Sequence, residues 1–445
     1  MINIDQISEK LSSYATPQKA KEKKFFLRSG GKIDALNFVQ SFFIMIQTGT
    51  NTLKAWAETL SYSTNFRTTF SDVAVNGKLQ FRQVEFFTSL LQDVIANQII
   101  KKSPKALTKR ALESFDRVFL EDSTCINLPE NLADYFPGPY SKTGKAATAR
   151  IQFRTELKEG TASHVEVQSY RDNDQKFSGA ILDCLQKKDL VIRDMGYWSL
   201  KVFEEIINKG AYLLSRYLPN THLFEVDGEQ KQINLIELVK KANKRGETTI
   251  DQEVIVGKKD RVPLRLVMLK VPEKVAAERR RKAKQNRNKR VNYTKEYMEL
   301  LAWGIYITNV GKSVWSPVDV LKVYGYRWRI ETIFKCWKTH FKFESLFADK
   351  QSLTPPRVII TIYLLLTWII LFFNRLYIYF EQAIFERKKE FISLMKFADF
   401  IKRWFSLFAN SNELEKHIDS VHYYCRYDKR SRENFAQQIY YEKLA

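Results

Sequence analysis

Cysteine and histidine, the side chains that most often bind transition metals, are scarce in this sequence. Its 445 residues include four cysteines and five histidines. The cysteines (Cys125, Cys184, Cys336 and Cys425) are far apart and form no C-x-x-C pair. This spacing excludes a zinc ribbon and argues against a disulfide framework, as expected in a reducing cytoplasm. The first residues lack the charged-then-apolar pattern of a secretory signal, so secretion is not indicated.

Acidic residues are too few to balance the basic ones. The 50 Asp and Glu residues face 72 Lys and Arg residues, so the formal charge is +22 and the pI is about 9.6. This surplus predicts a polyanionic partner, with nucleic acid as the first choice and an anionic membrane as the second. Hydrophobic residues make up 44% of the chain, which excludes general disorder. The length predicts two or three domains.

Long hydrophobic runs are also rare. One segment, Val358–Phe373, has sixteen residues without a charge and is followed at once by Asn374 and Arg375. A membrane-spanning helix needs about 20 apolar residues, with roughly 17 as the lower limit. We therefore predict a buried core helix instead of a membrane span, and a cytoplasmic, nucleoid-associated protein without a membrane partner.

The N-terminal part of the chain reads as helical. Apolar helical stretches cover Phe38–Ile46 and Phe86–Ile100, and basic residues surround Phe25 and Phe26. These basic residues are Lys19, Lys21, Lys23, Lys24, Arg28 and Lys32. The pattern predicts a helical DNA-binding domain over 1–110, and a plain helical packing domain remains the alternative because no recognition helix stands out.

A strand-rich pattern follows. Apolar or alternating runs predict strands near 117–120, 151–157, 163–169, 190–192 and 211–216, with an amphipathic helix over 199–209 that Ser199 caps. This order is typical of an α/β layer fold. Strand-like runs at 223–226, 248–256 and 264–269 then indicate a β-rich insertion over 217–300. The strand of 303–310 and a long helix from Pro317 return to the layer.

The insertion ends in a strongly basic run. Eight of the thirteen residues in Glu278–Arg290 are Lys or Arg. A solvated basic helix would have this composition, but the high net charge favours contact with phosphate. Arg279, Arg280 and Arg281 are therefore candidate DNA-binding residues.

One face of the helix after Pro317 carries a carboxylate between basic and phenolic groups. At 100° per residue, Tyr324, Arg327, Glu331 and Lys338 fall within an arc of about 60°. Salt bridges between residues four apart would explain Arg327 and Glu331, but they do not require Tyr324 and Lys338 on the same face. The stripe would also suit a metal-bound carboxylate with phosphate-binding groups on both sides.

The spacing Y-x-x-R-x-x-x-E-x(6)-K in this helix resembles the signature of the DDE transposases of bacterial insertion sequences, in the insertion-sequence-four group. Asp122, in Glu-Asp-Ser-Thr, looks like the first aspartate of that family. Asp194, in Asp-Met-Gly-Tyr, looks like the second, and Glu331 is the glutamate. Asp116 is the nearest competitor of Asp122, although it precedes the predicted strand.

The resemblance implies a ribonuclease-H-like catalytic core interrupted by the insertion. It also implies a transposase that binds the terminal inverted repeats, cleaves the element ends and joins the 3′-OH to target DNA, with a hairpin at the element end as one route. Three carboxylates suit two Mg²⁺ ions, or Mn²⁺ as a substitute, while Tyr324, Arg327 and Lys338 would bind phosphates and a homodimer would form the synaptic complex. A metal-dependent nuclease without strand transfer, and a silent transposase-derived DNA-binding protein, are the alternatives. We expect five segments. The helical N-terminal domain covers 1–110, the two parts of the catalytic core cover 111–216 and 301–380, and the insertion covers 217–300. The helical C-terminal region, 381–445, is expected to serve dimerisation.

Overall fold

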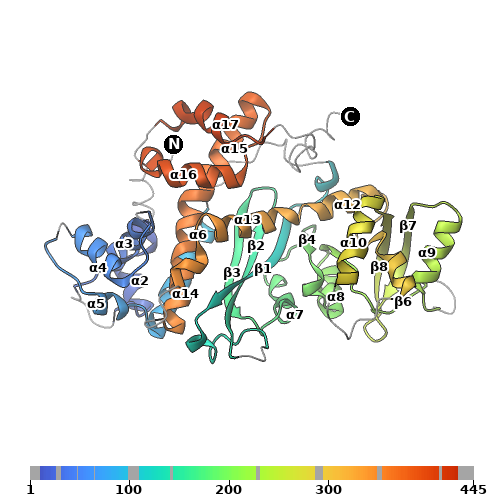
Figure 1. The fold of residues 1–445 in the computed structure, drawn as a ribbon, viewed down its shortest axis with the longest axis horizontal. Coiled ribbons are helices and arrows are strands. Elements are labelled where there is room, and N and C mark those ends of the chain that lie inside the picture. The colour runs from blue at the N-terminus through green and yellow to red at the C-terminus, as the bar shows by residue number, and fades with distance from the viewer. Residues whose placement is uncertain are drawn as a thin grey trace.

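The computed structural model describes residues 11–26, 32–47, 49–64, 66–98, 110–140, 144–226, 231–285, 294–347, 353–409 and 413–428. Over these residues the fold is mixed α/β, with one nine-stranded sheet and many helices around it (Figure 1). Arg28 of the N-terminal basic cluster, 286–290 of the basic run and 429–445 of the C-terminal region lie outside the described residues.

The sheet is mixed, with a parallel centre. Its strands are β1 (Val118–Leu128), β2 (Ala147–Glu156), β3 (Thr161–Ser169), β4 (Leu190–Arg193), β5 (Tyr212–Arg216), β6 (Leu223–Phe224), β7 (Thr249–Val256), β8 (Val262–Lys270) and β9 (Trp303–Thr308). Their order is β3-β2-β1-β4-β5-β9-β8-β7-β6. β1, β4 and β5 are parallel, and the other neighbours are antiparallel. The predicted strands are confirmed, most of them to within a few residues.

Helices make up the rest of the fold. The N-terminal helices are α2 (Pro17–Glu22), α3 (Ala35–Gln47), α4 (Leu53–Ser63), α5 (Asp72–Asn76) and α6 (Phe81–Ala96). Between the strands lie α7 (Asp174–Phe177), α8 (Leu200–Asn208), α9 (Leu235–Lys244), α10 (Glu273–Gln285) and α11 (Lys295–Leu300). After β9 come α12 (Pro317–Gly325), α13 (Trp328–Thr339), α14 (Pro355–Trp368), α15 (Arg375–Lys388), α16 (Leu394–Ala409) and α17 (Ile418–Cys425). α8 begins after the predicted cap, Ser199, whose hydroxyl accepts a hydrogen bond from the Val202 N–H.

The central strands are buried on both faces. Leu120 and Ile192 belong to one hydrophobic cluster, together with residues of the N-terminal helices and of α13 to α17. Phe119 and Val191 belong to a second cluster, which includes α8 and the strands of the insertion. Because successive side chains of a strand point to opposite faces, these two clusters cover the two sides of the sheet.

The insertion lengthens the sheet instead of forming a separate one. β9 pairs with β5 on one side and with β8 on the other, so that β6, β7 and β8 continue the core sheet (Figure 1). Three helices, α9 to α11, accompany these strands. The predicted strands of the insertion are present, whereas α9 (Leu235–Lys244) was not predicted from the sequence.

The apolar run forms a much longer helical segment than predicted. The helix does not end at Asn374 and Arg375, because α14 continues through a π-helical turn (Ile369–Asn374) into α15, up to Lys388. This segment is long and apolar enough to cross a membrane, but its most apolar 18-residue window is completely buried within the protein. The prediction of a buried core helix is confirmed. Arg375 does not end the helix, and its side chain is largely buried near Tyr14.

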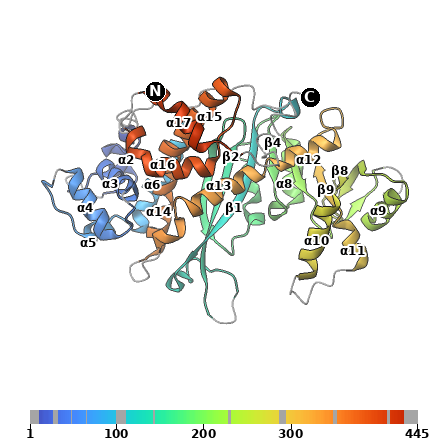
Figure 2. The same ribbon diagram turned by 45° about the horizontal axis from the view of Figure 1, so that its top comes forward.

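Two further predictions were wrong. The helix from Pro317 is not continuous, because the amides of Tyr326 and Arg327 bond three residues back and separate α12 from α13. Asp122 does not follow the end of a strand, since β1 extends to Leu128 and pairs with β2 along its length. Figure 2 shows α13 running across the face of β1 and β2.

All four cysteines are free, as expected from their spacing.

Candidate active site

Two neighbouring parallel strands bring two aspartates to one face of the sheet. The register of β1 and β4 pairs Leu120 with Ile192, and Asp122 and Asp194 each come two residues later. Asp194 has an extended backbone directly after β4. Since side chains alternate along a strand, both aspartates lie on the face that also carries Leu120 and Ile192, and this face packs against α13.

The α12–α13 segment supplies the groups that meet these aspartates. One nitrogen of the Arg327 guanidinium (Nη1) donates to Asp122 Oδ2 at 2.7 Å, and the other (Nη2) donates to Glu331 Oε1. The Tyr324 hydroxyl donates to Asp194 Oδ1 at 3.2 Å. Three carboxylates from distant parts of the sequence are therefore held together by two side chains, Tyr324 and Arg327.

Burial changes the protonation of this site. It raises the pKa of the Asp122 carboxyl to about 6, although the Arg327 charge and the Ser123 N–H act in the opposite direction. The negative charges of Asp194 and Asp174 add to the increase. Burial also raises the pKa of Tyr324, so its hydroxyl stays protonated and able to donate at neutral pH.

The turn after Asp194 is fixed by a second polar network. A Cβ atom at Gly196 would lie 2.9 Å from Asp174 Oδ2, so only glycine allows this close approach. The Tyr197 hydroxyl donates to Gln152 Oε1 at 2.5 Å. Gln152 Nε2 and Arg150 Nη1 both donate to Asp174 Oδ1, at 3.0 and 2.9 Å. The glycine and tyrosine that follow the second aspartate thus have structural reasons to be there.

Sequence reasoning missed Asp174, Arg150 and Gln152. A signal for two of them was present, because Arg150, Gln152 and Arg154 are polar and alternate with apolar residues at the start of the predicted strand 151–157 and just before it. On an inner strand this recurrence places them on one buried face, where polar groups need partners. Asp174 is on a four-residue helix, and nothing in its local sequence distinguishes it.

Neither Lys338 nor Asp116 contacts the cluster of Asp122, Asp194 and Glu331 through any hydrogen bond or ion pair found among the described residues. Lys338 is an exposed residue of α13. It lies near Cys125 of β1, because its charge, like that of Arg150, opposes the increase that burial causes in the pKa of the Cys125 thiol. Asp116 precedes β1, and its N–H donates to the Lys188 carbonyl before β4. It is therefore at the opposite end of these strands from Asp194.

The three arginines of the basic run have partners within the protein. Arg279 donates to the carbonyls of Leu301 and Trp303, at 3.3 and 3.1 Å. Arg280 donates to the Met298 carbonyl and to Glu273, and Arg281 pairs with Glu278. Arg279 and Arg280 thus hold α10 against α11 and β9. None of these contacts places them near Asp122, Asp194 or Glu331.

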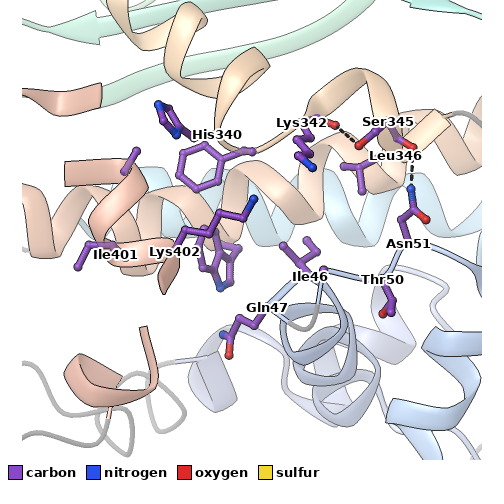
Figure 3. Close-up of a pocket in the computed structure, with 14 residues that line it drawn as sticks. Ile46, Gln47, Thr50, Asn51, His340, Lys342, Ser345, Leu346, Ile401 and Lys402 are labelled. Atoms are coloured by element: carbon purple, nitrogen blue, oxygen red, sulfur yellow. Dashed lines mark hydrogen bonds between the residues drawn. The ribbon is translucent and has the colours of Figure 1, made fainter. Parts of the chain in front are cut away.

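A cationic cavity lies beyond the C-terminal end of α13. It has a volume of about 130 Å³ and is formed by the end of α3, the residues after α13, Trp368 and α16. In Figure 3 the ammonium groups of Lys342 and Lys402 point into the same space from opposite sides, and His340 lies at one end. None of the lining residues, all in the described part of the chain, is acidic. Asn51 ties the N-terminal helices to this wall by donating to the Ser345 carbonyl at 2.6 Å.

The chemistry of the carboxylates fits a hard divalent cation. Asp122, Asp194 and Glu331 offer only oxygen ligands, which Mg²⁺ and Mn²⁺ prefer. Among the described residues no three His, Cys, Asp or Glu side chains are grouped so that they could hold a metal ion. In this structure the Arg327 guanidinium contacts both Asp122 and Glu331. The oxygen donors of this site therefore fit such an ion in kind.

Comparison with known proteins identifies relatives over most of the chain. The family description “Transposase DDE domain” matches residues 113–354. The transposase for insertion sequence element IS231B of Bacillus thuringiensis subsp. berliner is 27% identical over 369 residues, covering 78% of this chain and 76% of the relative. The transposase for IS1151 of Clostridium perfringens is 24% identical over 338 residues, covering 73% and 70%. A solved structure of a piggyBac transposase synaptic complex with hairpin DNA aligns with 98% of this chain and 88% of its own, at 9% identity and a TM-score of 0.45.

Proposed function

Since this chain belongs to the DDE transposases of bacterial insertion sequences, we propose that it binds the terminal inverted repeats of its own element, cleaves the DNA at the element ends and joins the freed 3′-OH to target DNA. The observation that carries the proposal is the meeting of Asp122, Asp194 and Glu331 on one face of the sheet, where Tyr324 and Arg327 bind them. Tyr324, Arg327 and Glu331 match the family signature in this sequence, and Asp122 and Asp194 resemble the two aspartates of the family.

The proposed catalytic core is ribonuclease-H-like. Its support is the order β3-β2-β1-β4-β5, in which β1, β4 and β5 are parallel while β2 and β3 are antiparallel to their neighbours. The first proposed aspartate is on the central strand of these five, and the second directly follows the strand beside it. The core would comprise 111–216 and 301–380, with 217–300 inserted between them.

Asp122, Asp194 and Glu331 would hold the divalent ions that this family generally uses. Two Mg²⁺ ions bound there would supply an activated hydroxyl and would stabilise the leaving 3′ oxygen in an in-line displacement at phosphorus. Arg327 is the residue of this chain best placed to respond, because its guanidinium makes one contact with each of two carboxylates and could instead bind a phosphate through two hydrogen bonds. Tyr324 stays protonated and can donate a hydrogen bond to a phosphate oxygen.

DNA would leave the site along α13. Eight helical residues separate Glu331 from the end of α13 at Thr339, or about 12 Å at 1.5 Å per residue. This distance matches three to four base-pair steps of about 3.4 Å each. Lys338 is on this path, and the cavity with Lys342 and Lys402 lies at its end. The path also reaches the N-terminal helices, so the proposed DNA-binding domain (1–110) would contact the DNA from this point on.

Parts of the N-terminal basic cluster serve packing instead. Lys19 pairs with Asp93, and Lys23 pairs with Glu85 at 2.9 Å. Phe25, at the centre of the cluster, is completely buried. DNA binding by 1–110 therefore depends on the remaining basic residues. The C-terminal region (381–445) is proposed to join two copies in the synaptic complex. Arg281 is more exposed than Arg279 and Arg280, and it is the strongest candidate phosphate contact among these three arginines.

The test is a product analysis with the chain's own element ends. Labelled double-stranded ends, a target plasmid and Mg²⁺ are incubated with the protein, and the products are separated on a denaturing gel. Cleavage at the end followed by joined product is the expected result, and a hairpin band would reveal that intermediate. Cleavage without any joined product would favour the metal-dependent nuclease, and binding without cleavage would favour a silent DNA-binding protein.

The raised pKa of Asp122 predicts that metal affinity depends on pH. The protonated carboxyl persists up to a pH of about 6, and a proton must leave before an ion can bind. Below pH 6 we therefore expect the Mg²⁺ affinity to fall by about tenfold per pH unit, while above it the affinity levels off. Calorimetric Mg²⁺ titrations between pH 5 and 8 measure this. Equal affinities at pH 5 and 7 would contradict it, and Asp122→Asn is the control that should lose this dependence.

The cavity at the end of α13 predicts a change in the salt dependence of DNA binding. Lys342 has a positive φ of 48°, which asparagine tolerates, so the double variant is Lys342→Asn with Lys402→Gln. Losing two phosphate contacts should lower the slope of log K against log[salt] by about 1.8.

Two exposed lysines at the ends of β4 and β5 that face away from Asp194 provide a matched control. Lys188 also has a positive φ and precedes β4, and Lys209 follows α8 and precedes β5. Both side chains are exposed. Lys188→Asn with Lys209→Gln should leave the slope unchanged. If both double variants change it equally, the cavity has no special contact with DNA.

A further inference from the structure

A buried ion triad lies directly behind the two aspartates of the site. Glu121 Oε1 accepts hydrogen bonds from Arg154 Nε and Nη2, at 2.9 and 2.7 Å. Glu121 Oε2 forms an ion pair with Arg193 Nη2 at 2.7 Å. The side chains are 0%, 3% and 1% exposed for Glu121, Arg154 and Arg193, respectively. Three charged groups are therefore enclosed where the second hydrophobic cluster meets the sheet.

The triad crosses three adjacent strands at one level. Glu121 on β1 is the register partner of Arg154 on β2 and of Arg193 on β4. Glu121 immediately precedes Asp122, and Arg193 immediately precedes Asp194. Because neighbouring side chains point to opposite faces, the triad is on one side of the sheet and the aspartates are on the other.

The outer ends of the triad are also anchored. Arg193 donates to the Ser178 hydroxyl and carbonyl, at 2.9 and 2.7 Å. Arg154 Nη1 contacts Cys184 Sγ at 3.3 Å. Both partners belong to the segment between α7 and β4, and this segment directly follows α7, whose first residue is Asp174. The triad thus joins β2, β1 and β4 to the segment that follows α7, the helix whose Asp174 supports the turn after Asp194.

Stability alone does not account for such a group. Apolar residues of similar volume usually stabilise a protein interior as well as a buried ion triad does, because the triad must first lose its hydration. An ion triad has a different property, since its opposite charges face one another in only one register. A slip of one residue between β1 and β4 would separate Glu121 from Arg193, and it would turn Asp122 to the other face of the sheet.

We propose that Glu121, Arg154 and Arg193 are positioning residues, which lock the register of β1, β2 and β4 and thereby hold Asp122 and Asp194 at the spacing that metal binding requires. This inference rests on the proposed function, because it assigns Asp122 and Asp194 to the metal site. It predicts that the triad affects metal affinity and the chemical step more than it affects DNA binding or folding.

The test replaces the whole triad with apolar residues of similar size, Glu121→Leu with Arg154→Met and Arg193→Met. We expect this variant, bound to element-end DNA, to bind Mg²⁺ about 10–100-fold more weakly by calorimetry and to cleave more slowly by a similar factor, the usual effect of losing groups behind metal ligands. The KM for DNA and the melting temperature should stay near the wild-type values.

A buried pair in the insertion is the matched control. Arg265 is 1% exposed and pairs with Asp251 across β7 and β8, at 2.8 and 2.9 Å. Arg265→Met with Asp251→Leu should leave Mg²⁺ affinity unchanged. Wild-type metal affinity and rate in the triad variant would overturn the proposal, as would an equal loss in the control.

A conservative variant covers the case in which the triple variant does not fold. Arg193→Lys keeps the charge, but an ammonium cannot replace the planar guanidinium that contacts Glu121 and Ser178 together. This variant should weaken Mg²⁺ binding at an unchanged melting temperature. If Arg193→Lys binds Mg²⁺ like the wild type, or also fails to fold, the triad serves folding alone and the inference is wrong. Failure of the proposed function is distinguished in the same assays, because the wild-type protein itself would then neither bind Mg²⁺ nor cleave.

Discussion

Glu331→Gln is expected to abolish cleavage of element ends in Mg²⁺ while leaving DNA binding intact or slightly tighter. Glutamine keeps the size of the side chain and can still accept a hydrogen bond from Arg327, which in the structure bridges Glu331 and Asp122. It lacks the negative charge that holds a divalent cation. It also removes a charge that repels phosphate, so the affinity for DNA should not fall.

Cleavage in this variant is measured as a single-turnover rate on labelled ends, and binding is measured separately by titration. Glu204→Gln is the matched control, because Glu204 is an exposed glutamate on α8. It should cleave at the wild-type rate. Loss of binding together with cleavage in Glu331→Gln would point to a structural role for this glutamate instead of a metal-binding one.

The second large effect is on stability and comes from Glu121→Leu alone. This change leaves the guanidinium groups of Arg154 and Arg193 buried next to each other without their shared carboxylate. Removing one partner of a buried ion pair typically costs about 3–5 kcal/mol, because the remaining charge loses its compensation. The free energy of unfolding from urea titration should fall by about that amount.

The triple apolar variant is the control for this effect. It should recover most of the stability that Glu121→Leu loses, since no buried charge remains. A Glu121→Leu variant as stable as the wild type would show that water reaches the two arginines. Recovery of stability without recovery of metal affinity in the triple variant is the combination that separates positioning from folding.

Local sequence predicted much of the sheet and of the signature helix. The strands of 151–157 and 163–169 could be predicted because their side chains alternate, and Ser199 could be predicted as a helix cap because of its position before an amphipathic run. The grouping of Arg327 with Glu331 followed from a spacing of four residues, which survives the break between α12 and α13 because the contact lies within one helical turn.

Other features depend on partners far away in the sequence. The polar segment Glu121–Thr124 reads as the end of a strand, but it continues β1 because β2 offers Arg154 and other polar partners. Asn374 and Arg375 read as a helix end, but Arg375 is accommodated in the interior near Tyr14. In the same way, the charge of Arg279 could be counted from the sequence, while its contacts with two backbone carbonyls could not.

The central claim is that Asp122, Asp194 and Glu331 form one catalytic site, and the choice of the first aspartate tests it most directly. Asp122 contacts Arg327 beside Glu331, whereas Asp116 is at the opposite end of the same strands. The measurement is the single-turnover rate of end cleavage in Mg²⁺ for Asp122→Asn and Asp116→Asn, with DNA affinity measured in parallel. We expect no detectable cleavage by Asp122→Asn and a wild-type rate for Asp116→Asn, with DNA binding retained in both. Wild-type cleavage by Asp122→Asn would contradict the account.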